Sequence, residues 1–182
     1  AMAQVRARAA SGLGRLAELA EWLAGWQGRP DPAVTRPLVA VFAAAHGIAA
    51  RNVTEEAADG GALRLARLAA GGAPVNHVCG ALDIGLKMFE LALEVPTRDF
   101  SATAALEERE CAATMAFGME ALAGGADLVC LGDIAVGGDL SAAAIGCALF
   151  GGTPAEWLGK TPAPAEPLGH RRIAVLTDAL SH

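Results

Sequence analysis

Residues 127–145 read DLVCLGDIAVGGDLSAAAI, and this stretch decides the fold. Its first part, 127–134, is an apolar run typical of a strand buried on both faces of a parallel sheet. A glycine-rich turn follows, and a helix of small residues is expected from about Asp139 to Phe150. Because a strand that leads through a turn into a helix begins a βαβ unit, the stretch predicts an α/β fold.

The same alternation continues towards both ends of the chain. The run LVAVFAA at 38–44 predicts a second buried strand, and KMFELALEV at 87–95 predicts a third. Helices are expected at 12–27 with Ser11 as N-cap, from Thr54 to Gly71, at 76–84, at 104–123 and at 170–180. Strands that alternate with helices predict right-handed βαβ units, and therefore a Rossmann-like parallel sheet with flanking helices.

Two parts of unequal size are predicted. Residues 1–36 hold a helix, expected to belong to a small helical subdomain, and the Pro-rich connector QGRPDPAVTRP. Residues 37–182 form the α/β domain. A length of 182 residues suits one ordinary domain with its own core. Ala1 ahead of Met2 is interpreted as the remnant of a tag, with Met2 as the native start.

Charge and hydropathy exclude several classes of partner. The chain has 14 Lys+Arg against 20 Asp+Glu, which gives a net charge of −6. This balance argues against a nucleic-acid partner and against a polybasic membrane-surface protein. The most apolar stretch, 141–150, is far shorter than the roughly 20 residues that span a bilayer, and the N-terminus lacks the apolar core of a signal peptide. A cytoplasmic protein without a membrane partner is expected.

No pattern of metal ligands is present in the sequence. The four cysteines, at 79, 111, 130 and 147, contain no CxxC pair and are predicted to be reduced, buried thiols. The four histidines, at 46, 77, 170 and 182, show neither HxxxH nor HExxH spacing. Neither a metal nor another cofactor is predicted.

Two predicted strand ends carry unusual residues: Ala45-His46-Gly47 and the segment 132–139. In open parallel sheets, ligands bind beyond the carboxyl ends of the strands. The glycines of 132–139 would let backbone N–H groups approach an anion, and the following helix dipole would favour its charge. The segment is neither a GxxxxGK[ST] loop nor a GxGxxG loop. The alternative is a glycine turn that serves only close packing of strand against helix.

Six segments, in order, resemble the nicotinate-nucleotide:dimethylbenzimidazole phosphoribosyltransferase family. They are SGLGRLAELAEWLAGWQGRP (11–30), VFAAAHGIA (41–49), GGAPVNHVC (71–79), PTRDF (96–100), LVCLGDIAVGGDLSAAAI (128–145), and WLGKTP (157–162) followed by HRRIAVL (170–176). The similarity runs through nearly the whole chain, which resembles the N-terminal half of the family's sequence.

The resemblance implies a function in cobalamin lower-ligand synthesis. Members transfer phosphoribose from nicotinate mononucleotide to 5,6-dimethylbenzimidazole, which yields α-ribazole 5′-phosphate and nicotinate. It also implies a homodimer, no metal, and a nucleotide or benzimidazole-like ligand. The residues it assigns to substrate binding are His46, Asn76, Asp133, Gly137, Gly138, Asp139 and Arg172, with Arg172 facing the phosphate.

The chain departs from the family's pattern at several functional positions. The family's proposed catalytic glutamate lies in a C-terminal stretch that these residues do not match, so no catalytic residue is assigned. Ala45 stands where the family has an aspartate, and 54–58, TEEAA, replaces a segment that lines the benzimidazole pocket with an aromatic ring and an amide. Asp139 puts a negative charge at the expected phosphate position, which would weaken phosphate binding by about one to three decades.

Structural roles are alternatives for several of these side chains. Asp139 would then cap its helix, His46 would be a hydrogen-bonded loop residue, and Arg172 would be a solvated residue of a helix. Asn76 would be a helix N-cap.

Three functions therefore remain open. The chain is a degenerate or partial member, a pseudoenzyme without activity alone, or it is one half of a split transferase that needs a C-terminal partner chain. The third alternative is a non-enzymatic small-molecule-binding α/β domain, in which the order of the motifs is coincidental.

A chain that matches half of a family fold should expose apolar surface, so we predict a homodimer or a complex with a C-terminal-half partner. The surface expected to take part is the helical one that includes Trp22 and Trp26, unless these rings belong to the core or pack against the 170–180 helix. Light scattering should give a mass above that of one chain, and a stable monomer at micromolar concentration would contradict this prediction.

Overall fold

A computed structural model describes residues 3–5, 13–57, 59–159 and 167–181. Its centre is one parallel sheet in the order β2-β1-β3. The strands are β1 (Pro37–Ala45), β2 (Gly85–Leu91) and β3 (Leu128–Val136). The predicted α/β class and the parallel sheet are therefore confirmed.

The central strand, β1, pairs on both sides. It runs beside β2 from Leu38 to Ala44 and beside β3 from Pro37 to Ala45. Its sequence, PLVAVFAAA, is apolar throughout because both of its faces are covered. The register places the carboxyl ends of all three strands at the same edge, where Ala45 lies beside Val136.

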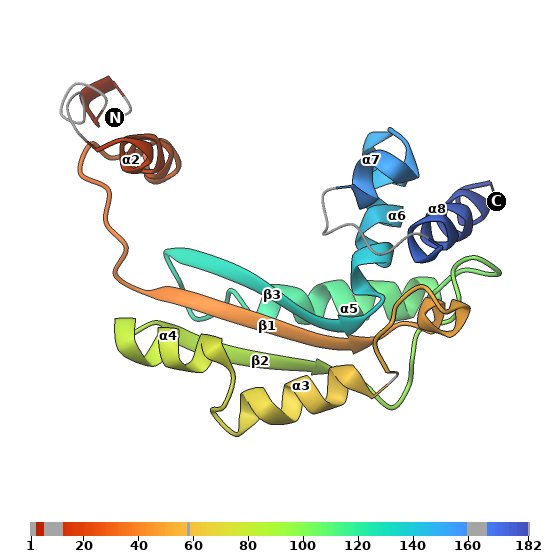
Figure 1. The fold of residues 1–182 in the computed structure, drawn as a ribbon. Helices are drawn as coiled ribbons and strands as arrows, with labels where there is room; N and C mark the ends of the chain where they lie inside the picture. The colour runs from red at the N-terminus through yellow and green to blue at the C-terminus, as the bar shows by residue number, and fades with distance from the viewer. Residues whose placement is uncertain (1–2, 6–12, 58, 160–166, 182) are drawn as a thin grey trace.

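Helices cover the sheet and extend beyond its carboxyl edge (Figure 1). Between β1 and β2 come α3 (Gly60–Ala69) and α4 (Pro74–Leu82), and between β2 and β3 comes α5 (Glu108–Glu120). In Figure 1, α5 lies behind the sheet, whereas α3 and α4 lie in front of it. After β3, the helices α6 (Gly138–Phe150), α7 (Pro154–Leu158) and α8 (Leu168–Ala179) gather near the strand ends.

The main hydrophobic core lies at this carboxyl edge. It joins the turn after β1 to α6, α7 and α8 through Ile48, Val53, Leu140, Ala143, Cys147, Leu158 and Leu176. Each large side chain buried in this way contributes about 1.5–3 kcal/mol. A second cluster joins the sheet to the end of α5, where the rings of Phe42 and Phe89 stack at a centroid distance of 4.9 Å. The larger core thus supports the strand ends, where ligands of such sheets bind.

Several predicted boundaries are wrong for local reasons. Thr54 does not cap the next helix: its hydroxyl accepts a hydrogen bond from the Glu56 N–H at 3.1 Å in a turn, and α3 begins only at Gly60. The strand predicted at 87–95 is β2 at Gly85–Leu91, because Ala92 adopts a φ of 45° that ends the extended chain.

Two short elements were not predicted. A 3₁₀ helix, Gly47–Arg51, follows β1, and α7 begins after Thr153. The sequence does contain a signal for α7, because Thr153 and Glu156 have the spacing of a capping box. In the structure the Glu156 side chain accepts a hydrogen bond from the Thr153 N–H at 2.7 Å. Helix α5 begins at Glu108 rather than at 104, because a Glu110 carboxylate oxygen accepts from the Glu107 N–H at 2.8 Å.

The N-terminal helix α2 (Arg15–Gln27) stands apart from the sheet at the end of an extended connector (Figure 1). It ends at Gly28, whose φ of 66° is left-handed, as the sequence predicted, whereas Ser11 lies outside the described residues. The exposed fractions of Trp22 and Trp26 are 54% and 77%. Since α8 lies at the opposite end of the molecule, packing of these rings against α8 is the wrong alternative.

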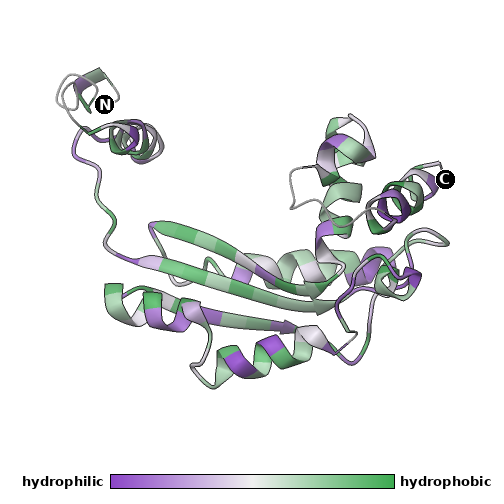
Figure 2. Ribbon diagram, in the orientation of Figure 1, coloured by the Kyte–Doolittle hydropathy of each residue, from purple (hydrophilic) through white to green (hydrophobic). Residues whose placement is uncertain are grey.

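Apolar surface is exposed in several other places, visible as green segments on outer helices in Figure 2. The prediction of four buried thiols holds for Cys79 and Cys147 but is wrong for Cys111 and Cys130, which are exposed; all four are free. Among the described residues, no helix has both the length and the hydropathy that crossing a bilayer requires. The predicted division at 36/37 coincides with the start of β1 at Pro37 and stays a prediction.

One carboxylate fastens the connector to the sheet. Asp127, at the start of β3, accepts hydrogen bonds from the Thr35 N–H at 2.7 Å, the Thr35 hydroxyl at 2.7 Å and the Arg36 N–H at 2.9 Å. The Thr35 bonds, followed by that from Arg36, lower the pKa of Asp127 from 3.8 to about 2. The ionised form therefore holds the entry to β1 and the start of β3 together.

We expect Asp127→Asn to lower the urea midpoint at neutral pH and to make it less sensitive to acid. Because the folded pKa is depressed, the contribution of Asp127 is complete above 3.8 and is lost as the pH falls through about 2. Urea titrations of both proteins across this range should converge. Asp178→Asn, which removes an exposed carboxylate from α8, is the control, and an equal pH slope for native and Asp127→Asn chains would contradict the prediction.

Candidate functional site

The candidate site lies at the carboxyl ends of β1 and β3. His46 follows the last residue of β1, and Asp133 lies on β3, opposite Phe42 of β1. From Val136 the chain passes through Gly137 and Gly138 directly into α6. Two predicted site residues and the predicted glycine turn are thus brought to one edge of the sheet.

His46 is held in place by α6. The distance from its Nδ1 to the Ser141 Oγ is 3.2 Å, so the predicted alternative of a hydrogen-bonded histidine describes its contacts. Burial lowers the pKa of His46, and the nearby Asp133 carboxylate raises it by less. The imidazole is therefore neutral at neutral pH and can accept a proton.

Asp133 is exposed on one side and is closely approached by the start of α6 on the other. Burial raises the pKa of its carboxyl, His46 and Arg64 lower it, and Asp139 raises it further. A Cβ at position 138 would overlap the Asp133 Oδ2, so only glycine lets the start of α6 approach this carboxyl group. Gly137 has a φ of 81°, and a Cβ there would lie 3.2 Å from Ile48 Cγ2. Close packing thus gives both glycines a structural role, and their part in substrate binding stays a prediction.

Asp139 and Arg172 form an ion pair between α6 and α8. The Arg172 guanidinium donates to the Asp139 Oδ2, and the side chains are 10% and 42% exposed, respectively. Gly137 is the N-cap of α6, and the Asp139 Oδ1 accepts a hydrogen bond from the Leu140 N–H in the first turn at 2.9 Å. Arg172 is not a solvated residue, since it is buried. The solvated alternative is therefore wrong for Arg172, whereas Asp139 occupies a backbone N–H at the start of its helix without being the N-cap.

Asn76 has a structural role between α3 and α4. Its Oδ1 accepts from the Ala73 N–H at 2.9 Å, and its Nδ2 donates to the Leu68 carbonyl at 3.0 Å. It is the third residue of α4 and not the N-cap, which is Ala73. The contacts of Asn76 thus join two helices and do not reach His46 or Asp133, so its part in substrate binding stays a prediction.

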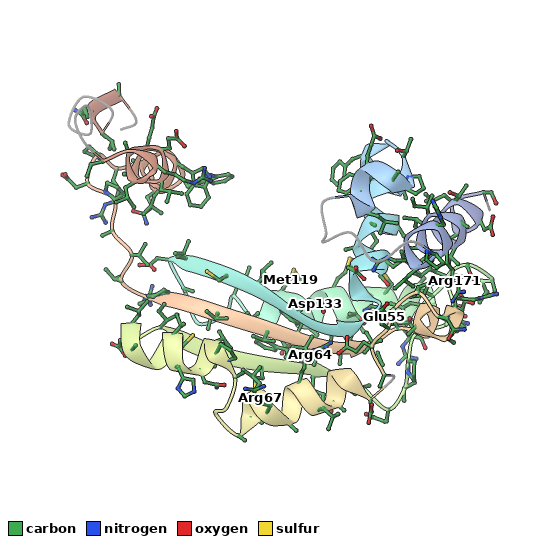
Figure 3. All side chains as sticks on the ribbon, in the orientation of Figure 1. Glu55, Arg64, Arg67, Met119, Asp133 and Arg171 are labelled. Carbon is green, nitrogen blue, oxygen red and sulfur yellow. The ribbon has the colours of Figure 1, made fainter. Side chains whose placement is uncertain are left out.

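Two residues of the site were not found from the sequence. Ser141 lies one turn into α6, within the small-residue run, and contacts His46. Arg64 projects from α3, pairs with Glu56 and lies close enough to Asp133 to lower its pKa (Figure 3). The position of Ser141, four residues after Gly137, was a usable signal; Arg64 lies in a helix without any motif.

The arrangement can exchange protons and recognise an anion, but the chain's own Asp139 already pairs with Arg172, the cation that would bind the anion. A neutral imidazole lies near a carboxyl group of raised pKa, which suits proton transfer near neutral pH. Two spaces border His46: a small one of about 120 Å³, lined also by Gly61, and a larger one of about 590 Å³, lined also by Leu91 and Glu110. The larger one has the size of a small-molecule pocket, which is roughly 300–1,000 Å³. Among the described residues, no three His, Cys, Asp or Glu side chains cluster to hold a metal.

Asp133→Asn should lower the pKa of His46 further, because it removes the negative charge that now raises it. Titration of the His46 ring protons by NMR measures the shift directly. Asp178→Asn removes the same charge from an exposed position and should leave the His46 titration unchanged. A His46 pKa that rises or stays constant in Asp133→Asn would show that the two groups do not interact.

Comparisons with known proteins identify related sequences. A phosphoribosyltransferase family model matches residues 2–182. Nicotinate-nucleotide–dimethylbenzimidazole phosphoribosyltransferases of Brucella canis and Brucella suis are each 50% identical to the chain over 172 residues. These alignments cover 94% of this chain but 51% of each relative, so the chain spans about half the length of the curated relatives it matches.

The fold agrees as well. The crystal structure of the nicotinate-nucleotide–dimethylbenzimidazole phosphoribosyltransferase from Thermus thermophilus is 27% identical and superposes with a TM-score of 0.82, covering 100% of this chain and 61% of that one. A second structure from the same organism gives a TM-score of 0.84. A coincidental order of motifs is therefore the wrong alternative: the chain belongs to the nicotinate-nucleotide–dimethylbenzimidazole phosphoribosyltransferase family.

Proposed function

We propose that the chain is the N-terminal half of a transferase that moves phosphoribose from nicotinate mononucleotide to a benzimidazole-type base, and that it has no transferase activity alone. In this reaction the unprotonated ring nitrogen of the base bonds to the anomeric carbon, the bond to nicotinate breaks, and the other ring nitrogen loses its proton. The names of the relatives support the substrates. The half of the relatives that this chain does not span is where the resemblance places the catalytic glutamate.

The observation that carries the proposal is the pair between Asp139 and Arg172. The resemblance assigns Arg172 to the substrate phosphate, and the chain's own carboxylate now occupies this guanidinium. A phosphate would have to displace Asp139 and would then lie beside its negative charge. The proposed consequence is weak nucleotide binding by these residues alone, in keeping with a partial or degenerate member of the family.

His46 and Asp133 supply the remaining chemistry of this half. Both lie where the sheet presents its strand ends, and both have pKa values shifted by burial towards the neutral form. We assign both side chains to positioning the bound base and to exchanging a proton with it. We assign neither side chain to the role of the catalytic glutamate, which the resemblance places in the half of the relatives that these residues do not span.

A split enzyme is the second candidate, because the chain matches its relatives so closely over only half of their length. A partner carrying the other half would then restore activity. A homodimer is also proposed, since exposed Trp22 and Trp26 form an edge-to-face pair on α2, with a centroid distance of 6.4 Å. Burying such rings between two copies would add stability.

Asp139→Thr should increase the affinity for nicotinate mononucleotide by about tenfold to a thousandfold, measured by calorimetric titration. The substitution frees a buried guanidinium and removes the competing charge. It should also lower the melting temperature, because an unpaired buried cation is costly, and nucleotide should restore it. Neither protein should form α-ribazole 5′-phosphate from nicotinate mononucleotide and 5,6-dimethylbenzimidazole.

Asp178→Thr on α8 is the matched control, since it removes one exposed carboxylate without touching Arg172. Micromolar binding by the native chain would contradict the competition between Asp139 and phosphate. If neither the native chain nor Asp139→Thr bound nicotinate mononucleotide, the assignment of this ligand would be contradicted. Product formation by the native chain would contradict the absence of activity.

A further inference from the structure

The loop at 96–106, between β2 and α5, borders the candidate site without having a role in it so far. It contains PTRDF (96–100), one of the segments that resemble the family, yet the resemblance assigns none of these five residues to substrate binding. In Figure 1 the chain between β2 and α5 passes beside the short helix that follows β1. Together with His46, residues of the loop line the space of about 590 Å³. The loop is therefore one wall of that space.

Thr97 is bonded to the backbone on both sides of His46. The Thr97 N–H donates to the Ala45 carbonyl at 3.0 Å, and the Thr97 Oγ1 accepts from the Gly47 N–H at 3.3 Å. Ala45 and Gly47 are the residues immediately before and after His46. One residue of the loop thus holds both peptide segments that determine the direction in which the histidine leaves the end of β1.

Gly47 shows how closely the loop approaches this turn. A Cβ at position 47 would overlap the Thr97 carbonyl oxygen and lie 2.9 Å from the Asp99 backbone nitrogen. Gly47 is not among the described glycines with a positive φ, so its backbone conformation does not itself require glycine. The position of the loop is therefore what excludes a side chain at 47.

The loop is held in shape by its own hydrogen bonds and by the helix after β1. The Arg98 N–H donates to the Ala105 carbonyl at 3.0 Å. The Asp99 Oδ1 accepts from the Ser101 N–H at 2.9 Å and from the Ser101 hydroxyl at 2.6 Å, while its Oδ2 accepts from the guanidinium of Arg51. Arg51 is half exposed, and such pairs add little stability. The pair instead fixes where the loop lies relative to the 3₁₀ helix Gly47–Arg51.

Resting on the proposed function, in which His46 positions the base, we propose that Thr97 is a positioning residue for His46 and that Asp99 keeps Thr97 in place. Ser141 contacts the imidazole ring from α6, whereas Thr97 holds the backbone from the opposite side of the chain. His46 and Pro96 line both the small and the large space. The contacts of Thr97 thus keep the imidazole at the boundary between these two spaces.

Thr97→Val tests the proposal, because it removes the hydroxyl and keeps the size and branching of the side chain. The pKa of His46 should rise towards 6.5, since a looser turn admits water to a ring whose pKa burial now lowers. The Gly47 amide hydrogen should exchange about tenfold faster, because it loses its acceptor. NMR measures both quantities. The charged groups around the ring, Asp133 on β3 together with Arg98 and Glu110 at the larger space, are unchanged by this substitution.

Thr97→Ser keeps the hydroxyl and should restore both native values. Thr177→Val is the matched control: it removes an exposed hydroxyl that donates to the Ile173 carbonyl at 2.8 Å on α8, and it should change neither value. Asp99→Asn should raise the pKa of His46 as Thr97→Val does, whereas the loss of a negative charge alone would lower it. This variant supplies the same measurement should Thr97→Val fail to fold.

A purely structural role for Thr97 predicts a different result. Thr97→Val would then lower the melting temperature and leave the pKa of His46 unchanged, and this outcome would overturn the proposal. Equal behaviour of Thr97→Ser and Thr97→Val would overturn it as well, because the hydroxyl would then not be responsible. None of these readouts uses a nucleotide or a base, so they succeed or fail independently of the proposed reaction.

Discussion

The two-sided pairing of β1 is the constraint on which the rest of the structure depends. With neighbours on both edges and helices over the sheet, β1 tolerates only apolar side chains, and its run of alanines keeps the layer thin. The parallel direction of the pairing then brings His46 and the end of β3 to the same edge. The core formed by Ile48, Leu140 and Leu176 fixes α6 and α8 over that edge, which is how Asp139 meets Arg172.

The site shows how packing and charge compete for the same few positions. Gly138 is small because Asp133 needs room, and Asp133 in turn is kept partly away from water. The start of α6 would by itself attract an anion, but Asp139 already brings one, and the buried Arg172 neutralises it. A charge pair of this kind favours one arrangement of α6 and α8 while it occupies the group that a phosphate would use.

The sequence predicted what depends on continuous patterns. The apolar runs at 38–44 and 127–134 located two strands, although only the first is largely buried, since Cys130, Leu131 and Asp133 of the second are exposed. Boundaries that depend on single residues were harder to predict from the sequence. Thr54 stabilises a turn and does not begin a helix, and the left-handed backbone of Ala92 ends β2 early. At the site, His46 and Asp133 could be placed from the strand ends. The contacts of Ser141 and Arg64 could not, because they depend on how separate helices pack.

The order of the strands has a consequence during synthesis of the chain. β2 lies next to β1 and follows it after α3 and α4, but the other neighbour, β3, ends only at Val136. A ribosome would thus expose one side of the most apolar strand while α5 and its flanking loops are still being added, since long-range parallel pairs form late. Asp127 cannot reach Thr35, 92 residues earlier, until that point. Chaperone demand should accordingly be greatest between the emergence of β2 and that of β3.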